Sequence, residues 1–331
     1  MMLIDSPQVR RFLSLTGQRL PIVQAPIGSC AIPPLASEVA RAGGLGGLAL
    51  SWSTPDAATQ AIAATKAKAD GNPFFANFVL HFPCEAFDAA LDAGVPLVTF
   101  SWGVDPARIA RARSAGVKVG VQVGHPLGAR AARDAGVDFL IAQGIEAGGH
   151  VQSSTPLASL LPQVLNEAGD LPVIAAGGIA TGSSIAHAIT QGAAGVMMGT
   201  RFVASTESGA HDVYKQAIIA ATDGDAAYTL CFDGGWNAAH RALRNDTLAA
   251  WEAAGCPLAG TRPGEGEILY RHGTEAIARY SDTPPNCGAE GALLSAVLYA
   301  GTGVGAITQV EPAAQIVTRL WSEAEASMRI P

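Results

Sequence analysis

The chain has 331 residues, of which 49% are hydrophobic and 15% are charged, so a large buried core is available and the composition excludes a disordered protein. The formal net charge is −7 and no run of Lys or Arg occurs, which argues against nucleic acid or an anionic membrane surface as a partner. No apolar run reaches the roughly 20 residues that a membrane span needs.

The N-terminal segment and the cysteine pattern both bear on where in the cell the protein is expected. The N-terminal segment MMLIDSPQVRRFLSL lacks the apolar core and cleavage site of a secretory signal. The cysteines are scattered and form no CxxC pair; they are Cys30, Cys84, Cys231, Cys256 and Cys287. This pattern disfavours a disulfide scaffold or a zinc ribbon and predicts a reducing, cytoplasmic location.

One pattern recurs through the first two thirds of the chain: an Ala-rich helical stretch ends at a glycine, and an apolar run follows at once. Glycine is the residue that most easily takes the left-handed conformation at a helix end, and the run after it predicts a buried parallel strand. The glycines are Gly43, Gly71, Gly94, Gly116, Gly136, Gly169 and Gly192. With the strand LPIVQAP, which starts at Leu20, they predict eight strands that alternate with helices.

Alternating strands and helices imply parallel βαβ units. Eight of them, in a chain long enough for one barrel of roughly 250 residues and an insertion, predict an α/β fold of the (β/α)₈ TIM barrel type. A doubly wound open sheet is the alternative. It is disfavoured because no GxGxxG motif opens a helix straight after the first strand.

The regular alternation of helices and strands ends after Arg201. The segment from about Ser205 to Cys287 contains helical stretches and loops without an obvious strand-helix pair, which predicts a mainly helical domain inserted after strand eight, residues 206–288. The barrel then comprises residues 1–205 and 289–331, and the tail segments GALLSAVLYAG and AAQIVTRLWSEAEASM are expected to be helical and to complete its outer ring.

We expect the inserted domain to lean over the C-terminal mouth of the barrel, because the chain leaves strand eight there. Trp236, in the Gly-rich segment DGGWN, is a candidate wall of the substrate cavity. A packing role within the inserted domain is the equal alternative.

Two glycine-containing strand ends predict a phosphate site. Strand seven closes with Gly177 and Gly178, and strand eight with Gly199 and Thr200. The loops after these two strands hold phosphate in many barrels, since backbone N–H groups can approach the oxygens where no Cβ intervenes. The alternative is that these glycines only form tight turns. Arg201 could assist, but an Arg in this position is more often part of an ion pair.

The loop after strand six, AQGIEAGGH, places His150 behind two glycines at the barrel mouth. Imidazole titrates near neutrality and suits proton transfer or the binding of an anion. The alternative is a loop histidine bonded to the backbone, which is the interpretation we prefer for His187, His240 and His272.

Polar side chains interrupt otherwise apolar strand ends at Gln24, Asn77, Gln122 and Gln143. Buried amides need hydrogen-bond partners, and the polar edge of a flavin ring would satisfy several at once. A network of amides and water is the alternative. No Cys lies in the loop after strand six, which argues against a mechanism with a covalent thioimidate. Lys118 lies at the wrong end of its strand for a Schiff base. No HxxxH pair or carboxylate cluster indicates a metal site.

The segments QAPIG, GGLGG, FFANF, AQGIEAGGH, PVIAAGGIATG and MMGTRF together resemble the nitronate monooxygenases, also called 2-nitropropane dioxygenases. FMN-dependent enoyl-reductases and bacterial NADH:quinone reductases share much of the pattern. The resemblance is strong over roughly the first 215 residues and extends through SGAHDVYK and DGGWNAAHRALRN. Where this family often continues GGH with Arg-Gly, the present chain has Val151 and Gln152, so its substrate contacts are expected to differ.

The resemblance implies an FMN-dependent barrel with FMN at the C-terminal ends of the strands. It implies that the ring lies along Gln24, Ala25 and Pro26, and is contacted by Asn77, Gln122, Gln143 and Gly148. It further implies that Gly177, Gly178, Gly199 and Thr200 hold the phosphate and that His150 is catalytic.

The implied reaction is the oxidation of an alkyl nitronate by O₂ to a carbonyl compound and nitrite, with His150 as base for a neutral nitroalkane. Two alternatives stay open: an NAD(P)H-dependent flavin reductase acting on a quinone or an enoyl thioester, and a non-redox barrel that binds a phosphorylated ligand. The expected partners are a small-molecule nitronate and O₂, with neither nucleic acid nor membrane, and the sequence leaves open whether the chain forms a homodimer.

Overall fold

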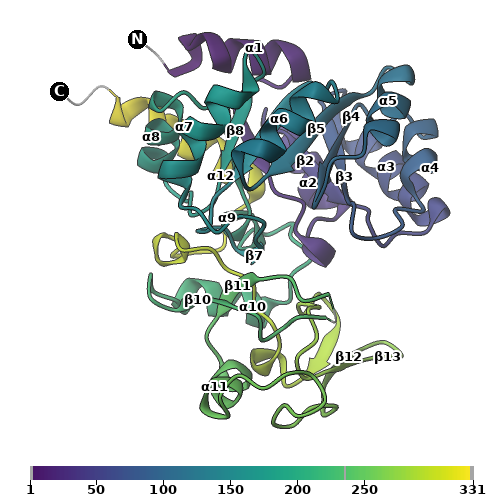
Figure 1. Ribbon diagram of the computed structural model, residues 1–331, viewed down its shortest axis with the longest axis vertical. Coiled ribbons are helices and arrows are strands. Elements are labelled where there is room, and N and C mark those ends of the chain that lie inside the picture. The colour runs from purple at the N-terminus through teal and green to yellow at the C-terminus, as the bar shows by residue number, and fades with distance from the viewer. Residues whose placement is uncertain (1–2, 235, 329–331) are drawn as a thin grey trace.

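Eight parallel strands form the larger lobe, the upper one in Figure 1. The computed structural model describes residues 3–234 and 236–328. The strands are β1 (Ile22–Gln24), β2 (Gly46–Ala49), β3 (Phe74–Val79), β4 (Leu97–Ser101), β5 (Lys118–Val123), β6 (Phe139–Gln143), β8 (Val173–Ala176) and β9 (Gly195–Met198). Their order in the sheet is β1-β9-β8-β6-β5-β4-β3-β2.

The sheet closes into a barrel between its two edge strands. Val23 and Leu45 form a parallel bridge. The N–H of Gln24 donates to the carbonyl of Leu45 at 3.0 Å, and the N–H of Leu45 donates to the carbonyl of Ile22 at 2.9 Å. The predicted TIM barrel is therefore confirmed, and so is each of the eight predicted strands.

Helices cover the outside of the barrel between successive strands (Figure 1). They are α2 (Pro33–Arg41), α3 (Pro55–Ala69), α4 (Phe87–Asp92), α5 (Pro106–Ser114), α6 (Pro126–Asp134), α7 (Leu157–Ala168) and α8 (Gly182–Thr190). The tail returns as α12 (Ala313–Ser327), which packs against α8 and α2 as the sequence predicts. The seven predicted stop glycines all have positive φ, between 61° at Gly169 and 100° at Gly192, a conformation that explains why glycine stands there.

The N-terminal end of the barrel is sealed by apolar side chains. Helix α1 (Pro7–Thr16) inserts Phe12, whose ring lies 5.5 Å from that of Phe139 on β6. A Cβ at Gly120 would lie 2.3 Å from the Phe139 ring, so the absence of a side chain there makes room for the seal. The barrel is thus a packed core at this end, and only its C-terminal end is left for a ligand.

The segment after β9 forms a second lobe, residues 206–300, below the barrel in Figure 1. Its helices are α10 (Asp212–Ala220) and α11 (Asp246–Ala253), and its strands are β10 (Ala226–Thr229), β11 (His240–Leu243), β12 (Ile268–His272), β13 (Glu275–Ala278) and β14 (Ala289–Gly291). The prediction of a mainly helical insertion is therefore wrong for the residues that the structure describes. The expected helix over GALLSAVLYAG is also absent, since this segment holds the end of β14 and the short 3₁₀ turn Leu293–Ser295.

Tertiary pairing explains the difference. The segment GTEAIARY becomes β13 because it folds back on β12, with Arg271 opposite Ala276. The other edge of β12 pairs with β14, with Arg271 opposite Glu290. These pairings, a short hairpin with β13 and a more distant contact with β14, override the helix preference of the Ala-containing sequence.

The two lobes are joined at the barrel mouth by hydrogen bonds as well as by the chain. The loop after β6 contains a two-residue strand, β7 (Gly149–His150), which pairs antiparallel with β11 so that His150 lies opposite His240. The N–H of Val151 donates to the carbonyl of Ala239 at 2.8 Å. This pairing fixes the second lobe over the C-terminal end of the barrel and positions His150 between them.

Candidate active site

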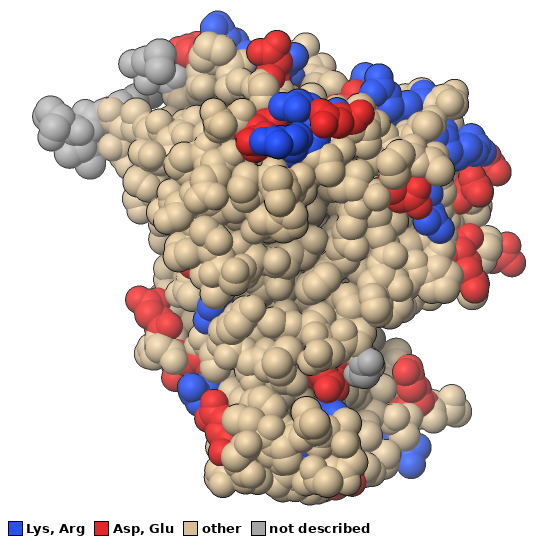
Figure 2. Space-filling view, in the orientation of Figure 1, with Lys and Arg blue, Asp and Glu red and all other residues tan. Residues whose placement is uncertain are grey.

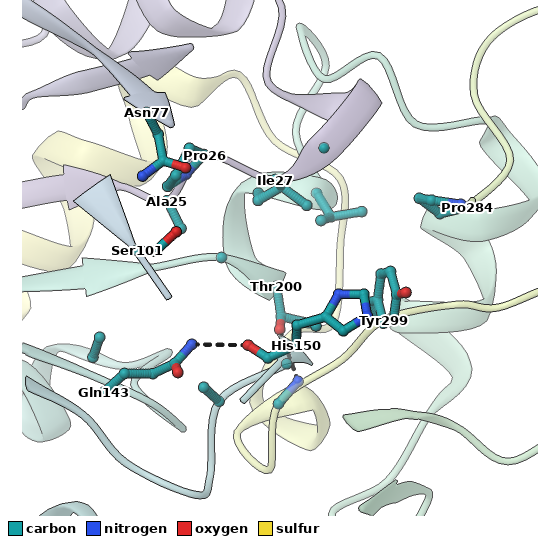
Figure 3. A pocket seen from close by; sticks show the side chains of 18 of the residues that line it. Ala25, Pro26, Ile27, Asn77, Ser101, Gln143, His150, Thr200, Pro284 and Tyr299 are labelled. Atoms are coloured by element: carbon teal, nitrogen blue, oxygen red, sulfur yellow. Dashed lines mark hydrogen bonds between the residues drawn. The ribbon is translucent and has the colours of Figure 1, made fainter. Parts of the chain in front are cut away.

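A cavity of about 650 Å³ opens at the C-terminal ends of the strands, between the barrel and the second lobe. Figure 3 shows its lining residues converging from several strand ends and from the tail. Eleven of the twelve predicted site residues line it: Ala25, Pro26, Asn77, Gln122, Gln143, Gly148, His150, Gly177, Gly178, Gly199 and Thr200. Trp236 of the second lobe also lines it, as the sequence predicts for the substrate cavity.

Gln24 is the exception, because its side chain lies outside the cavity. The residue is 0% exposed, and its Oε1 accepts a hydrogen bond from the N–H of Gly47 at 2.8 Å while its Nε2 donates to the carbonyl of Ala25. Side chains alternate along a strand, and Val23 is the residue of β1 that packs into the barrel interior. Gln24 therefore faces the neighbouring strand β2, and its expected contact with a ring is withdrawn.

The glycine strand ends meet as the sequence predicts. Within the described residues, the backbone N–H groups of Gly178 and Gly199 have no hydrogen-bond acceptor and are free to bind one. Gly178 has a φ of 68°, and a Cβ on it would lie 2.8 Å from the Oγ1 of Thr302. The site is thus a hollow of backbone donors in which a side chain would not fit.

The tail supplies a third segment that the sequence analysis did not identify. The N–H of Gly301 donates to the Oγ1 of Thr200 at 2.9 Å, and the N–H of Thr302 donates to the carbonyl of Glu146 at 3.0 Å. A Cβ on Gly148 would lie 2.5 Å from the nitrogen of Gly301, which explains the glycine at position 148. The alternating glycines of the segment GTGVG were the available signal.

Arg201 does not take part in this hollow. Its side chain is 2% exposed and forms an ion pair with Glu311, with 3.3 Å between Nη1 and Oε2. Its Nη2 donates to the carbonyls of Ala204 and Gln309, both at 2.7 Å. The ion-pair alternative given for this Arg is the one that the structure shows, although the pair is buried rather than at the surface.

The strand-end amides form partly the expected arrangement and partly a network of their own. The Nδ2 of Asn77 donates to Thr99 Oγ1 at 3.0 Å, which leaves its Oδ1 facing the cavity. Gln152 links the other two, because its Oε1 accepts from Gln122 Nε2 at 2.7 Å and its N–H donates to Gln143 Oε1 at 2.9 Å. Gln152 is one of the two residues at which this chain departs from the resembled family.

His150 lies among aromatic rings under the second lobe. Its ring centroid is 4.4 Å from that of Trp236, 5.5 Å from that of Tyr299 and 6.4 Å from that of Trp102. Tyr299 is seen beside it in Figure 3, where a dashed line marks the hydrogen bond from Gln143 Nε2 to the His150 carbonyl, 3.2 Å long. The sequence analysis singled out neither Trp102 nor Tyr299.

The charge state of His150 follows from these surroundings. Burial, with a smaller contribution from His240, lowers the pKa of His150 to about 3, so the ring is neutral near pH 7. Its Nε2 accepts a hydrogen bond from the indole N–H of Trp236 at 3.0 Å. A neutral imidazole that accepts at Nε2 carries its proton on Nδ1. Within the described residues Nδ1 has no partner, so its N–H is free for a ligand.

His240, behind His150, is a structural histidine. Its Nε2 accepts from the N–H of Phe232 at 3.1 Å, and its Nδ1 lies 3.0 Å from the carbonyl of Ala238, to which it donates. Burial lowers its pKa. Both ring nitrogens of neutral His240 therefore have backbone hydrogen-bond partners, which agrees with the interpretation preferred from the sequence, a histidine bonded to the backbone.

A closed parallel barrel with free backbone donors after strands seven and eight, and a neutral buried histidine at its mouth, has the features of a barrel enzyme that binds a small molecule. Comparison with known families makes this specific. The family model described as nitronate monooxygenase matches residues 11–90 and 85–323. The chain belongs to the nitronate monooxygenase family and is therefore an oxidoreductase.

Individual relatives support this family, two of them over nearly the whole chain. A nitronate monooxygenase from Pseudomonas aeruginosa is 30% identical, with 95% of this chain and 98% of the relative covered. The solved structure of a nitroalkane oxidase from Streptomyces ansochromogenes is 30% identical, with a TM-score of 0.76 and with 96% of this chain and 99% of that chain covered. A relative from Rhodococcus jostii, named as an indene carboxyl-CoA dehydrogenase, is 36% identical over 73% of this chain and 67% of its own.

Two further observations bear on the cellular setting. Among the described residues, no helix is long and apolar enough to cross a membrane. The five cysteines are all free.

Proposed function

We propose that this protein is an FMN-dependent nitronate monooxygenase, which oxidises an alkyl nitronate with O₂ to a carbonyl compound and nitrite. The observation that carries the proposal is the state of His150, a neutral imidazole with a free Nδ1–H in the substrate cavity. Such a group donates a hydrogen bond to an anion without first needing a proton. A nitronate is an anion whose charge lies on two oxygens, and it fits this donor.

The residues present fit FMN. The free N–H groups of Gly178 and Gly199, with Thr200 beside them, suit a phosphate. Ala25, Pro26, Asn77 and Gly148 line the same cavity, where a flat ring would lie, and the Oδ1 of Asn77 is available to accept from a ring N–H. When bound, FMN would supply the redox chemistry by accepting electrons from the substrate and passing them to O₂.

The chain's own contribution is orientation, electrostatics and the exclusion of water. His150 Nδ1–H would hold a nitronate oxygen, and the rings of Trp102, Trp236 and Tyr299 would surround the substrate with apolar surface. A hydrogen bond to an anion in such surroundings is stronger than the same bond in water.

A neutral nitroalkane places a different demand on the same histidine. To remove its proton, an imidazole needs a free lone pair, and the one at Nε2 accepts from Trp236. Proton abstraction would therefore require Trp236 to release Nε2, or the ring proton to move from Nδ1. This asymmetry supports the preformed nitronate as the substrate class that the resting site is ready to bind.

The test compares oxygen uptake and flavin reduction on one preparation. The protein as purified is mixed with a primary alkyl nitronate in air, and nitrite and oxygen consumption are measured. In parallel it is mixed anaerobically with NADH and with NADPH, and flavin bleaching is followed. Rapid oxygen uptake with slow bleaching supports the proposal. Rapid bleaching without nitronate turnover overturns it in favour of a reductase.

A second candidate function is that of an oxidoreductase acting on an acyl thioester, which is favoured by the relatives named as carboxyl-CoA dehydrogenases. Acyl-thioester chemistry on this barrel would require a site that accepts the phosphates of coenzyme A. The charged residues that line the cavity, Glu275 and Asp282, are both acidic and do not favour such phosphates.

A further inference from the structure

The charged residues that line the cavity are both acidic. They are Glu275 and Asp282, and both come from the second lobe. Among the described residues, no Lys or Arg lines the cavity. In Figure 2 the indentation between the two lobes on the visible face is bordered mainly by uncharged residues, while most Lys and Arg of the barrel lie away from it.

Two arginines that contact loops next to the cavity are paired with acidic partners. Arg262 lies 3.3 Å from Asp233 and 3.4 Å from Glu265, which engages both sides of its guanidinium. Arg108 donates to the carbonyl of Pro83 at 3.0 Å and pairs with Asp105 at 2.5 Å. These two guanidinium groups are therefore engaged by carboxylates, whereas that of Arg241 donates to the backbone carbonyls of Ile145 and Ala226.

The two acidic residues differ in their surroundings. Asp282 packs against Gly234 beside Trp236, and burial raises the pKa of its carboxyl group. Glu275 is exposed and stands at the start of β13, where the turn from β12 reaches the cavity. Of the two, Glu275 is the solvent-exposed carboxylate.

The remaining surface at the mouth is aromatic. Trp52 is 59% exposed, which is unusual for so large an apolar side chain. Its ring lies 5.2 Å from that of Phe82, and the Phe82 ring lies 5.2 Å from that of Trp236. These three rings line the cavity and offer an uncharged substrate a continuous apolar contact.

We propose that Glu275 is a specificity-determining residue, which makes the cavity select nitronates with an uncharged alkyl or aryl remainder and reject substrates that carry a second negative charge. This inference rests on the proposed function. A nitronate held at His150 has its own charge matched by a hydrogen-bond donor. A carboxylate or phosphate at its far end would meet the aromatic rings and Glu275 and would find no cation. The same repulsion disfavours a phosphate-bearing carrier such as coenzyme A.

Binding of matched ligands tests this selectivity without turnover. Nitrobenzene and 4-nitrobenzoate have no hydrogen on the carbon that bears the nitro group, so neither forms a nitronate. Their dissociation constants are measured with the flavin-loaded protein from the change in the visible spectrum. We expect nitrobenzene to bind about tenfold or more tightly than 4-nitrobenzoate at low salt, and the ratio to shrink at roughly 1 M salt, where the Debye length is about 3 Å.

Charge reversal identifies the residue. Glu275→Lys should lower the preference for nitrobenzene at least about fivefold, because a repulsive charge becomes an attractive one. Glu290→Lys is the matched control, since Glu290 lies on β14 of the same small sheet but does not line the cavity, and it should leave the ratio unchanged. Equal affinities in the unmodified protein, or an unchanged ratio in Glu275→Lys, would overturn the inference.

Kinetics separates this inference from the proposed function. The specificity constant kcat/KM is compared for butyl-1-nitronate and for the same nitronate with a terminal carboxylate. Turnover of both with equal constants overturns the selectivity and leaves the proposed function intact. Absence of turnover with both substrates overturns the proposed function, while the ratio for the two nitrobenzene ligands still decides whether Glu275 selects against a second charge.

Discussion

The indole N–H of Trp236 donates to Nε2 of His150 across 3.0 Å, and so a residue of the second lobe sets the tautomer of a histidine that belongs to the barrel. The contact bridges 86 positions of the sequence. It makes Nδ1 the protonated nitrogen and leaves a hydrogen-bond donor facing the cavity. Trp236 is therefore a positioning residue for His150.

Trp236→Phe keeps an aromatic ring but removes the donor. Turnover of a preformed nitronate should fall by about 2- to 10-fold, the worth of one neutral hydrogen bond, because Nδ1 is no longer fixed as the protonated nitrogen. Turnover of the corresponding neutral nitroalkane should fall less or rise, since the Nε2 lone pair becomes free. The measurement is kcat/KM for both substrates across pH 6–9, with Trp102→Phe as the control that changes a neighbouring ring without touching Nε2. Equal losses on both substrates would show that Trp236 acts only through packing.

His150→Asn removes the imidazole while leaving the proposed phosphate and ring contacts in place, so the protein should retain flavin. Activity on the preformed nitronate should fall, because the variant lacks the Nδ1–H donor that the proposed function assigns to the nitronate oxygen. If His150 also acts as the base for a neutral nitroalkane, activity on that substrate should fall further, by about 10²- to 10⁴-fold, the usual contribution of a positioned base. Flavin absorbance and both kcat/KM values are measured on the same sample. Equal losses would mean that His150 only binds or orients the anion, and no loss would mean that it is a loop histidine without a role in the reaction.

The barrel was predictable because its sequence signals are local and repeated. Each helix ends at a glycine of positive φ and each strand follows within a few residues, so adjacent segments of the chain carry the information. The two glycine-containing loops of the proposed phosphate site were predictable as loops for the same reason. The second lobe was not, because β12 is only five residues long and owes its strand conformation to β13 and β14, the latter some 20 positions further on.

The site shows the same division between local and distant information. Gln24 was assigned to the ligand only because it is an amide at a strand end. Side chains alternate along a strand, and the neighbouring Val23 already packs into the barrel interior, so Gln24 faces away from it. Trp102 precedes His150 and Tyr299 follows it at a distance in the sequence, and only the folded protein brings their rings together. Gln152 was noticed as a departure from the family, but its link between Gln122 and Gln143 depends on distances that the sequence does not contain.

Gly178→Val tests the proposed phosphate hollow. The new side chain would have to displace Thr302 Oγ1, which would lie 2.8 Å from its Cβ, and would narrow the approach to the free N–H of Gly178. We expect a folded barrel purified with little or no flavin. Gly116→Val is the matched control, because Gly116 has a similar φ of 76° but nothing within 4 Å of a Cβ. Both variants carry the backbone strain, and only the first should lose the cofactor. Full flavin content in Gly178→Val would remove the support for this phosphate site.

The depressed pKa of His150 predicts how stability depends on pH. Burial favours the neutral ring in the folded protein, where the pKa is about 3, whereas the unfolded chain has the ordinary value of about 6.5. Above about pH 6.5 neither state is protonated and the stabilising contribution is fully present. As the pH falls toward 3, the unfolded state binds a proton that the folded state does not. The free energy of unfolding should then drop by up to about 1.4 kcal/mol per pH unit for each such histidine, and His240 adds to the effect because burial lowers its pKa as well.

The measurement is the free energy or midpoint of unfolding between pH 7 and pH 5.5, at constant flavin content. His150→Asn should flatten the dependence, because the asparagine binds no proton in either state. His187→Asn is the control, since His187 lies on the outer helix α8 and should keep the full slope. The sign is decisive: a protein that becomes more stable as the pH falls over this interval would have His150 charged in its folded state, and the neutral Nδ1–H donor assigned to the nitronate site would then be wrong.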